Sequence, residues 1–357
     1  MDADLLQASE GPSYVESESP RLRCLEFFCG IGGFHVALRR VCNNIDVVGA
    51  FDINTTTNRI YKFNFPDTPL FERNIQALTV KSLDRQDADI WAMSPPCQPF
   101  VKRGLQLDLK DPRCAALKHL CDCICEMKNP PRFVIVENVP GFQNSAAEEM
   151  LIQALDDRGY QHKVSIENPW NHGIPNSRPR YFLTAKLGAN RVLPKKLVNR
   201  WVTELPRTIG DILSPNSDAC NDLFLSTEFI MRHMDVIDIV EPRSFNSNCF
   251  TKAYGSYVKG AGSYLVTNVP KDHGILEFGK IHLLRLGTGN NKMEAVKNLK
   301  IRAFSVGEIC RLMGFNDELM QPPDITRIQM YKCLGNSVNI FNVCNLLTHL
   351  LFDSWAV

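Results

Sequence analysis

The stretch DIWAMSPPCQPF at residues 89–100 is the most informative part of the sequence. Its first five residues form a short apolar run typical of a buried strand, and the double proline that follows ends the strand in a stiff turn. Open α/β folds bind their ligands at the carboxyl ends of such strands. Cys97 therefore stands where a rigidly mounted nucleophile is useful, although a thiol in a proline-rich loop is equally a small buried hydrophobic residue.

Apolar runs of the same kind recur on both sides of this stretch. They occupy residues 22–28, 45–51, 132–136, 161–166 and 180–186, and helix-like segments alternate with the runs as far as residue 136. Strands that alternate with helices predict βαβ units, and so an α/β fold with a mostly parallel central sheet.

The pattern divides the chain into four parts. Residues 1–20, rich in Ser, Glu and Pro, predict a disordered acidic tail. The regular pattern fills 21–190, is lost over 191–300, where we expect a smaller lobe, and returns over 301–357, which we expect to complete the main domain. In the last part Ser305 and Glu308 predict a capping box, and residues 338–352 predict an apolar closing helix.

The composition limits which classes of protein the chain can belong to. The chain has 357 residues, 44% hydrophobic and 22% charged, and it contains neither an apolar run long enough to span a membrane nor a secretory signal. Thirteen scattered cysteines fit a reducing compartment, so we expect an intracellular protein. The Cys121, Cys123 and Cys125 cluster falls in an apparent helix, where alternate residues point apart, and predicts packing more strongly than a metal site.

Charge is uneven along the chain. The formal net charge is +1, but residues 1–20 hold five acidic residues and no Lys or Arg, which leaves 34 acidic against 40 basic residues in the remainder. This mildly basic body permits a phosphate-binding surface without requiring one.

Several polar or glycine-rich segments follow the predicted strands. CGIGGF at 29–34 permits close approach of a ligand to the backbone or simply close packing of a helix, and it lacks the GxGxxG spacing of dinucleotide sites. Asp52 ends the second strand, where it suits ribose hydroxyls or the cap of a helix from Asn54. Glu137 ends the strand after 132, at the same sheet edge as Cys97.

Two later segments complete the set. Arg178 and Arg180 are two residues apart, so in extended backbone they point the same way, as they also would on an exposed strand edge. Gly335-Asn336-Ser337-Val338 precedes the apolar closing segment, and we expect it to open that helix and to supply backbone donors at the positive end of the helix dipole.

Taken in order, LEFFCGIGG, FDIN, SPPCQPF, ENV, NSRPR and LGNSV resemble the motif series of the cytosine-C5 methyltransferases over residues 22–352. CFTKAY at 249–254 is similar to the CFTxxY signature of the DNA methyltransferase homologue two branch, whose members methylate RNA, chiefly cytosine thirty-eight in the anticodon loop of tRNA-Asp. Asn74, Asn176 and Ala261 depart from the usual pattern without removing a reacting atom.

The resemblance implies a Rossmann-like, S-adenosylmethionine-dependent methyltransferase fold with a target-recognition lobe at 191–300. It implies a cofactor, S-adenosylmethionine, that becomes S-adenosylhomocysteine, and no metal. Cys97 is implied as the nucleophile, with Glu137, Arg178 and Arg180 as its catalytic partners. The implied cofactor contacts are Phe27, Phe28, Gly30, Gly32, Gly33, Asp52, Ile53, Asn74, Ile75, Pro95, Asn336, Ser337 and Val338.

The expected partner is tRNA, chiefly tRNA-Asp, because a base in a single-stranded loop is easily extruded, with DNA a weaker partner and DNA cytosine methylation the alternative activity. Candidate RNA contacts are Lys102, Arg103, Lys252, Tyr254, Tyr257 and Lys259, although each of them, taken alone, is more readily explained as a solvated surface residue. Cys249 would lie near the active site in a secondary thiol role. A binding or scaffold protein is the third hypothesis, which an intact Cys97, Glu137 and Arg180 set disfavours. We expect a monomer in the cytoplasm, with nuclear residence open.

Overall fold

A seven-stranded sheet forms the centre of the molecule. In the computed structural model, which describes residues 21–101, 106–188, 204–214, 221–268 and 290–353, the strand order is β3-β2-β1-β4-β5-β7-β6. These strands are β1 (Leu22–Phe27), β2 (Ile45–Phe51), β3 (Leu70–Phe71), β4 (Ile90–Met93), β5 (Phe133–Asn138), β6 (Tyr160–Glu167) and β7 (Arg180–Leu187). All pairs are parallel except those of β7, which runs antiparallel to β5 and β6. The predicted α/β fold is confirmed.

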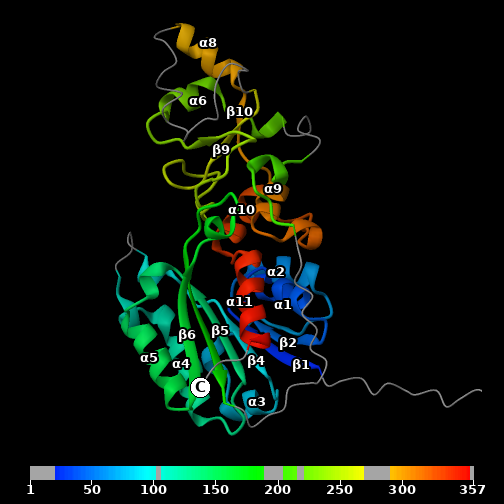
Figure 1. Cartoon of the computed structure of the whole chain (residues 1–357), viewed down its shortest axis with the longest axis vertical. Helices are drawn as coiled ribbons and strands as arrows, with labels where there is room; N and C mark the ends of the chain where they lie inside the picture. Colours follow the sequence, from blue (N-terminus) through cyan, green and yellow to red (C-terminus); the bar gives the residue numbers. More distant parts are fainter. Residues whose placement is uncertain (1–20, 102–105, 189–203, 215–220, 269–289, 354–357) are drawn as a thin grey trace, which may run out of the picture.

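Helices cover both faces of this sheet (Figure 1). On one side lie α1 (Gly33–Val41), α2 (Thr55–Asn64) and α11 (Ile340–Phe352), and on the other lie α3 (Val80–Asp84), α4 (Ala115–Glu126) and α5 (Ala146–Asp156). Alternate residues of β4 serve the two layers, because Ile90 and Ala92 join the first apolar core and Trp91 and Met93 join the second. The buried strand β4 is therefore apolar throughout.

The order in which strands are added to the sheet reverses between β1 and β4, although these two strands are parallel. From β1 the chain proceeds through α1 to β2 on one side, and β4 then pairs with the other side of β1. A crevice forms outside the carboxyl ends of strands at such a reversal. The segments after β1, β2, β4 and β5 therefore meet at one edge of the sheet.

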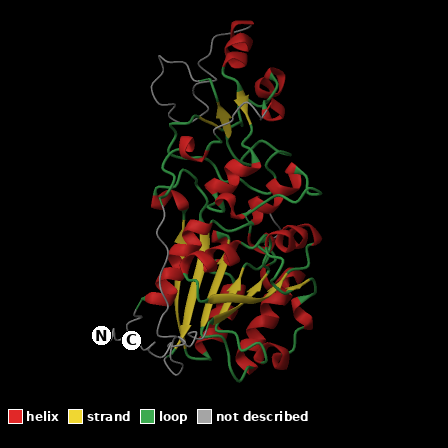
Figure 2. Ribbon diagram, turned by 90° about the vertical axis from the view of Figure 1, so that its right-hand side faces the viewer, coloured by secondary structure: helices red, strands yellow, loops and turns green. Residues whose placement is uncertain are grey.

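A smaller lobe extends beyond that edge (Figure 2). It contains α6 (Thr227–Arg232), α8 (Asn290–Asn298) and a three-stranded sheet of β8 (Ile239–Val240), β9 (Tyr264–Val266) and β10 (Ile301–Arg302). Two further helices, α9 (Val306–Leu312) and α10 (Arg327–Asn336), lie between this lobe and the sheet. Ser305 caps α9 reciprocally with Glu308, as predicted.

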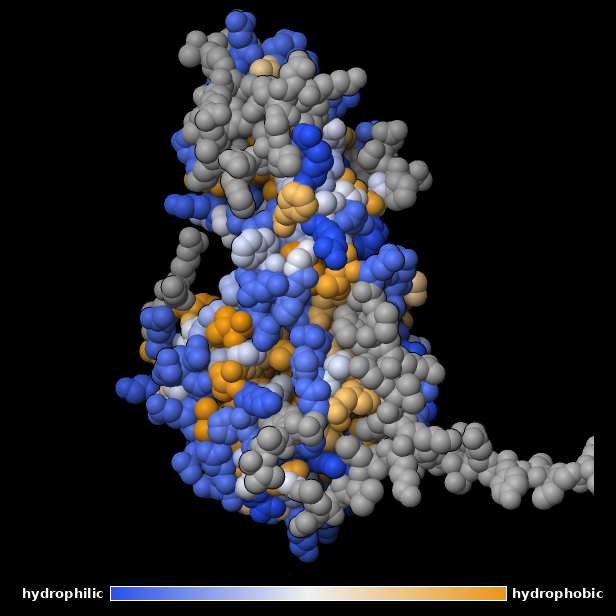
Figure 3. All heavy atoms as spheres, viewed as in Figure 1, coloured by the Kyte–Doolittle hydropathy of each residue, from blue (hydrophilic) through white to orange (hydrophobic). Residues whose placement is uncertain are grey.

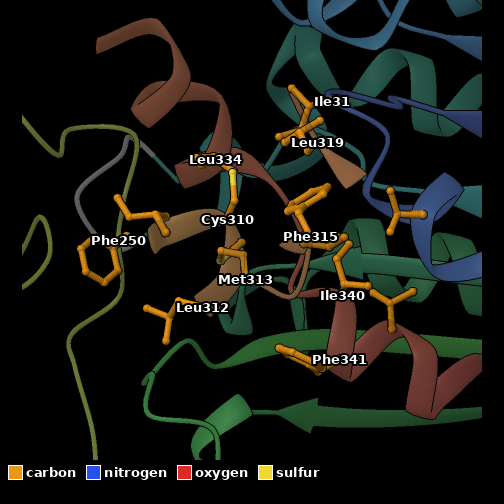
Figure 4. Packing of buried hydrophobic residues seen from close by; sticks show 14 of the residues in the cluster. Ile31, Phe250, Cys310, Leu312, Met313, Phe315, Leu319, Leu334, Ile340 and Phe341 are labelled. Atoms are coloured by element: carbon orange, nitrogen blue, oxygen red, sulfur yellow. The ribbon is translucent and has the colours of Figure 1, made fainter. Parts of the chain in front are cut away.

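One apolar core runs through both parts of the molecule. The cluster that packs α1 against α11 continues through Cys310 and Leu334 to Phe250 of the smaller lobe (Figure 4). On the face that Figure 3 shows, apolar patches lie over the sheet domain and near its junction with the smaller lobe. In the described ranges, no helix combines the length and the apolar character needed to cross a membrane.

The prediction for the segment 335–338 is wrong in one respect. Gly335 and Asn336 end α10, Ser337 follows as its cap, and α11 begins only at Ile340, with Asn339 as its N-cap. The side-chain oxygen of Asn339 accepts the first free N–H groups of α11, so this segment supplies the carboxyl end of one helix and not the dipole of the next.

Candidate active site

Cys97 lies in a turn that is held on two sides. It follows β4 and immediately precedes the 3-10 helix η2 (Gln98–Phe100), with the thiol half-buried. Asn138, at the end of β5, donates from Nδ2 to the carbonyl of Pro95 at 3.3 Å. On the other side, a Cβ on Gly141 would overlap the carbonyl of Phe100, so the two backbones touch. The asparagine of the ENV motif thus anchors the cysteine turn.

Glu137 and Arg180 meet beside this turn. In the antiparallel β5–β7 pair Glu137 lies opposite Phe182, which puts Arg180 diagonally across on the same face. Arg180 Nε is 3.3 Å from Glu137 Oε1, and the carboxylate is only 7% exposed. Burial raises the pKa of Glu137, although the two arginines and a hydrogen bond from Ser94 oppose the shift.

The Cys97 thiol is not a preformed thiolate. Burial, and secondly the charge of Glu137, raise the pKa of Cys97, while Arg180 and Lys252 oppose them. Lys252 acts from the smaller lobe, because the backbone of Thr251 and Lys252 lies against Gly335 of α10. Charges from both parts of the molecule therefore set the reactivity of this sulfur.

Arg178 and Arg180 converge, as their spacing predicts, but they do different things. Arg178 is 1% exposed, and its guanidinium donates to the carbonyls of Phe250, Gly335 (3.1 Å) and Ser337. It ties together three segments far apart in the sequence. Arg180 is the arginine with donors directed at Glu137.

A cavity of about 580 Å³ opens beside these groups. Cys97, Glu137, Arg178 and Arg180 line it, and its walls also include the predicted cofactor contacts Phe28, Gly30, Asp52, Ile53, Asn74, Ile75, Pro95 and Asn336. A small adjoining recess is lined by Gly33, Ser337 and Val338. The sheet edge therefore brings most of the predicted residues around one space.

The glycine turn at 29–34 permits both the approach of a ligand to the backbone and close packing against neighbouring segments. Gly30 has φ +55° and faces open space at the cavity wall, so a ligand can approach its backbone. Gly32 and Gly33 instead permit close packing, because a Cβ on them would overlap Phe65 and Val338, respectively. Gly32 is not among the described residues that line the cavity or its recess, so its contact with a cofactor stays a prediction.

The side chains of Phe27 and Phe28 face different surroundings. That of Phe27 is fully buried and packs against Phe51 and Trp91 at ring-centroid distances of 5.1 and 4.9 Å, whereas Phe28 lines the cavity. Successive residues of a strand point to opposite faces, so only one of the two phenylalanines can reach the ligand.

Asp52 links the segment that follows β1 to the start of α2. One carboxylate oxygen accepts from the backbone N–H of Gly30 at 3.0 Å and the other accepts from that of Asn54 at 2.8 Å. Asn54 is itself the N-cap of α2, so Asp52 is not the cap. Burial raises the pKa of Asp52.

The residues present fit S-adenosylmethionine. Ile53 is 72% exposed although apolar, and with Ile75 it offers two apolar surfaces suited to a flat ring, next to a carboxylate suited to ribose hydroxyls. The open face of Gly30 leaves room for the methionine end. Asn74 lines the same wall and accepts from the N–H of Gln76.

Sequence reasoning missed several residues that line the cavity: Asn54, Thr57, Gln76, Ser94, Pro96, Gln98, Pro112, Arg113, Ala116, Val139 and Gly335. Among these Arg113 is held in a forked ion pair by Asp111, at 2.8 Å from Nε and 2.6 Å from Nη2. Its position in the DPR string behind the cysteine turn was the available signal.

The predicted RNA contacts separate into exposed residues, residues outside the described ranges and the buried Tyr254. Lys252, Tyr257 and Lys259 are exposed, as contact with RNA requires. Lys102 and Arg103 lie outside the described residues.

Tyr254 is buried and does not fit its predicted role as an RNA contact. It is 1% exposed, and its hydroxyl donates to the carbonyl of Ser263 and accepts from the N–H of Phe304, both at 2.9 Å. Packed against Tyr264 and Tyr331, it stabilises the lobe and cannot stack on a base.

The cysteine cluster lies in α4. Cys121 and Cys123 are each 2% exposed in the apolar core, and Cys125 is exposed. In the part of the chain that the structure describes, no three His, Cys, Asp or Glu side chains are grouped to hold a metal ion.

Comparisons with known proteins agree with this geometry. The family model for C-5 cytosine-specific DNA methylase matches residues 22–350. The tRNA (cytosine(38)-C(5))-methyltransferase of Bos taurus is 34% identical over 387 residues, covering 91% of this chain and 98% of the relative. The DNA (cytosine-5)-methyltransferase of Dictyostelium discoideum is 31% identical and covers 93% and 94%. The crystal structure of S. pombe Dnmt2 methyltransferase matches with a TM-score of 0.76 at 32% identity, covering 93% of this chain and 98% of that one.

Proposed function

Because the chain belongs to the C-5 cytosine-specific DNA methylase family, we propose that it transfers a methyl group from S-adenosylmethionine to C5 of a cytosine in the anticodon loop of tRNA, position 38 of tRNA-Asp. The observation that carries this proposal is the convergence of Cys97, Glu137 and Arg180 at one wall of a cavity that also contains Asp52 and Gly30. One wall offers a nucleophile and its partners, and the other suits the methyl donor.

The reaction begins with the sulfur of Cys97. Its thiolate adds to C6 of the cytosine, which gives C5 the enamine character that it otherwise lacks. The rigid turn between β4 and η2 holds the sulfur near its line of attack. S-adenosylmethionine, when bound, supplies the electrophilic methyl group that C5 then takes. Loss of the C5 proton to a base and departure of the Cys97 thiolate restore the ring.

Glu137 stabilises the charge that develops on the ring. Buried beside Cys97, it is placed to hold the N3 and N4 edge, and its raised pKa suits a carboxyl group that passes a proton to N3. Arg180 pairs with Glu137 through Nε, donates from Nη1 to the carbonyl of Pro179 at 2.8 Å and lines the cavity. In the proposed reaction its guanidinium would hold the cytosine carbonyl or a neighbouring phosphate.

RNA is the preferred substrate on physical grounds. The target base must leave its stack to reach Cys97, which costs less in a single-stranded loop than in a duplex. Lys252, Tyr257 and Lys259 are exposed on the segment that follows Cys249, where they can meet phosphates or stack on bases. The bovine relative, named for position 38 of tRNA, supports the same choice.

One assay tests the proposal. Purified protein is incubated with tritiated methyl donor and either tRNA-Asp or duplex DNA, with Cys97→Ala as the matched variant. We expect label in tRNA that is lost when the target cytosine is replaced by uracil, and no label with Cys97→Ala. Full activity of Cys97→Ala would refute the covalent mechanism. RNA that contains 5-fluorocytosine, with donor present, should in addition form a stable crosslink to Cys97.

DNA cytosine-5 methylation is the second candidate. The Dictyostelium relative with that name, 31% identical over nearly the whole chain, favours it. It uses the same reacting groups, so only the substrate arms of the assay separate the two. Labelling of duplex DNA but not of tRNA would replace the first proposal by the second, and labelling of neither would favour a binding protein.

A further inference from the structure

Cys249 contacts both arginines of the active site. Its Sγ lies 3.3 Å from Nη1 of Arg178 and 3.9 Å from Nη2 of Arg180, both of which donate toward the sulfur. Among the described residues that line the cavity Cys249 is absent, whereas Cys97 is present. The mechanism proposed above makes no use of this second thiol.

The charges of the cluster explain why a sulfur stands there. Arg178 is 1% exposed, and its other acceptors are neutral carbonyls of Phe250, Gly335 and Ser337. Glu137 forms an ion pair with Arg180. With a neutral thiol at 249, two guanidinium groups would share one carboxylate, and a buried uncompensated cation is strongly destabilising. A thiolate at 249 makes the net charge of Arg178, Arg180, Glu137 and Cys249 zero, while the exposed Lys252, whose charge acts on Cys97, is not counted among these four groups.

The electrostatic surroundings favour that ionised form. Burial acts to raise the pKa of Cys249, but Arg178 and Arg180 together outweigh it and lower the pKa below the usual 9.0. For Cys97, Cys114, Cys310 and Cys333 the shift is in the opposite direction. What distinguishes Cys249 is the pair of guanidinium groups within 4 Å.

We propose that Cys249 is a positioning residue for the methyl transfer, whose thiolate holds the guanidinium groups of Arg178 and Arg180 so that Arg180 faces Glu137. This rests on the proposed function of the same site. The sulfur does not touch the substrate. It keeps the arginine fork in place, and its charge balances that of the buried Arg178.

The first test needs no catalysis. Thiolates absorb near 240 nm, so the difference in absorbance between the wild type and Cys249→Ser, followed against pH, reports the ionisation of Cys249 alone. We expect a transition at lower pH than that of a free cysteine. Cys125→Ser, which removes an exposed thiol outside the arginine cluster, should retain it. A wild-type protein without this early transition would refute the thiolate.

The second test measures the reaction. Cys249→Ser keeps the size of the side chain but not the charge, and we expect a kcat lower by about 10- to 100-fold, because a misdirected Arg180 disturbs Glu137. The acidic limb of the pH profile due to Cys249 should disappear. Cys249→Asp, which restores a negative charge, should recover part of the rate and move that limb to lower pH.

Folding and function are checked separately. S-adenosylhomocysteine should stabilise the wild type, Cys249→Ser and Cys249→Asp against unfolding to the same extent, because Asp52 and Ile75 do not contact Cys249. A Cys249→Ser enzyme with wild-type kcat and pH profile would overturn the positioning role. If the wild type methylates neither tRNA nor DNA, the proposed function fails, while the absorbance titration still decides whether Cys249 is a thiolate.

Discussion

The two acidic groups nearest the reaction, the thiol of Cys97 and the carboxyl of Glu137, each make the ionisation of the other less favourable. Glu137 is buried and Cys97 is half-buried, and each has a raised pKa. At neutral pH the free enzyme therefore holds Cys97 mainly as a thiol, which protects it from adventitious electrophiles. Lys252 and Arg180 oppose this effect, so a substrate that engages Glu137 would favour the thiolate.

Replacing Glu137 by Gln should separate reactivity from catalysis. The variant removes a negative charge beside the sulfur, so iodoacetamide should modify Cys97 several times faster at pH 7.5, as followed by mass spectrometry. Methyl transfer should fall by about 100-fold or more, because the group that handles the N3 proton is lost. Glu149→Gln, an exposed change on α5, is the control. Slower alkylation in Glu137→Gln would contradict the proposed coupling.

The end of α10 is the element on which the two parts of the molecule meet. Gly335 packs so closely on Thr251 and Lys252 that a Cβ would overlap their backbone, and its carbonyl accepts from Arg178. The φ of Gly335 lies in the ordinary range, so the glycine is needed for this close approach and not for an unusual backbone conformation.

Gly335→Ala should therefore destabilise the protein by about 1–3 kcal/mol and lower methyl transfer as well, because Lys252 and Arg178 must move. Urea unfolding measures the first effect and the tRNA assay the second. Gly188→Ala, where the added methyl group meets nothing within 4 Å, should change neither. Equal stability of the two variants would show that the helix end can shift freely.

The junction of β1 and α1 predicts a dependence of stability on pH. Glu26 is fully buried, accepts from the Tyr61 hydroxyl at 3.1 Å, and burial raises its pKa from 4.5 to about 8. Between these values the unfolded chain releases a proton that the folded protein keeps, so stability falls as pH rises. Burial lowers the pKa of His35 to about 3, which has the opposite effect below pH 6.5.

From pH 6.5 to 8 only the effect of Glu26 remains of these two. The free energy of unfolding should fall by at most about 2 kcal/mol over that interval in the wild type and by clearly less in Glu26→Gln, as measured by urea unfolding at both pH values. Glu149→Gln should follow the wild type. The same decline in Glu26→Gln would mean that Glu26 is already ionised in the folded state.

The molecule as a whole should unfold as one unit, since one apolar core extends from the sheet domain into the smaller lobe. Tyr254 tests this, because it lies in the lobe but hydrogen-bonds Phe304, just before α9. Tyr254→Phe should lower the stability by about 1–2 kcal/mol in a single transition seen alike by fluorescence and circular dichroism. Tyr257→Phe, at an exposed neighbour, should not. Separate transitions would show that the lobe unfolds independently.

From the sequence alone came the α/β class, six of the seven strands of the central sheet, the capping box at Ser305 and the proposal of Cys97 and Glu137 as reacting groups. Each of these depends on residues close together in the chain, and the carboxyl ends of parallel strands meet at one edge whatever lies between them. The strand ends after 93 and 137 thus sufficed to bring Cys97 and Glu137 together.

Only the tertiary structure decided which of these residues face the cavity. Gly32 and Phe27 turn to the core, Tyr254 supports the lobe, and Arg178 binds carbonyls more than 70 residues away. Such outcomes depend on which distant segment occupies the space beside a residue, and a local pattern of polar and apolar residues contains no information on that neighbour. For the same reason the contact of Cys249 with the two arginines, 69 and 71 residues away in the chain, became visible only in the fold.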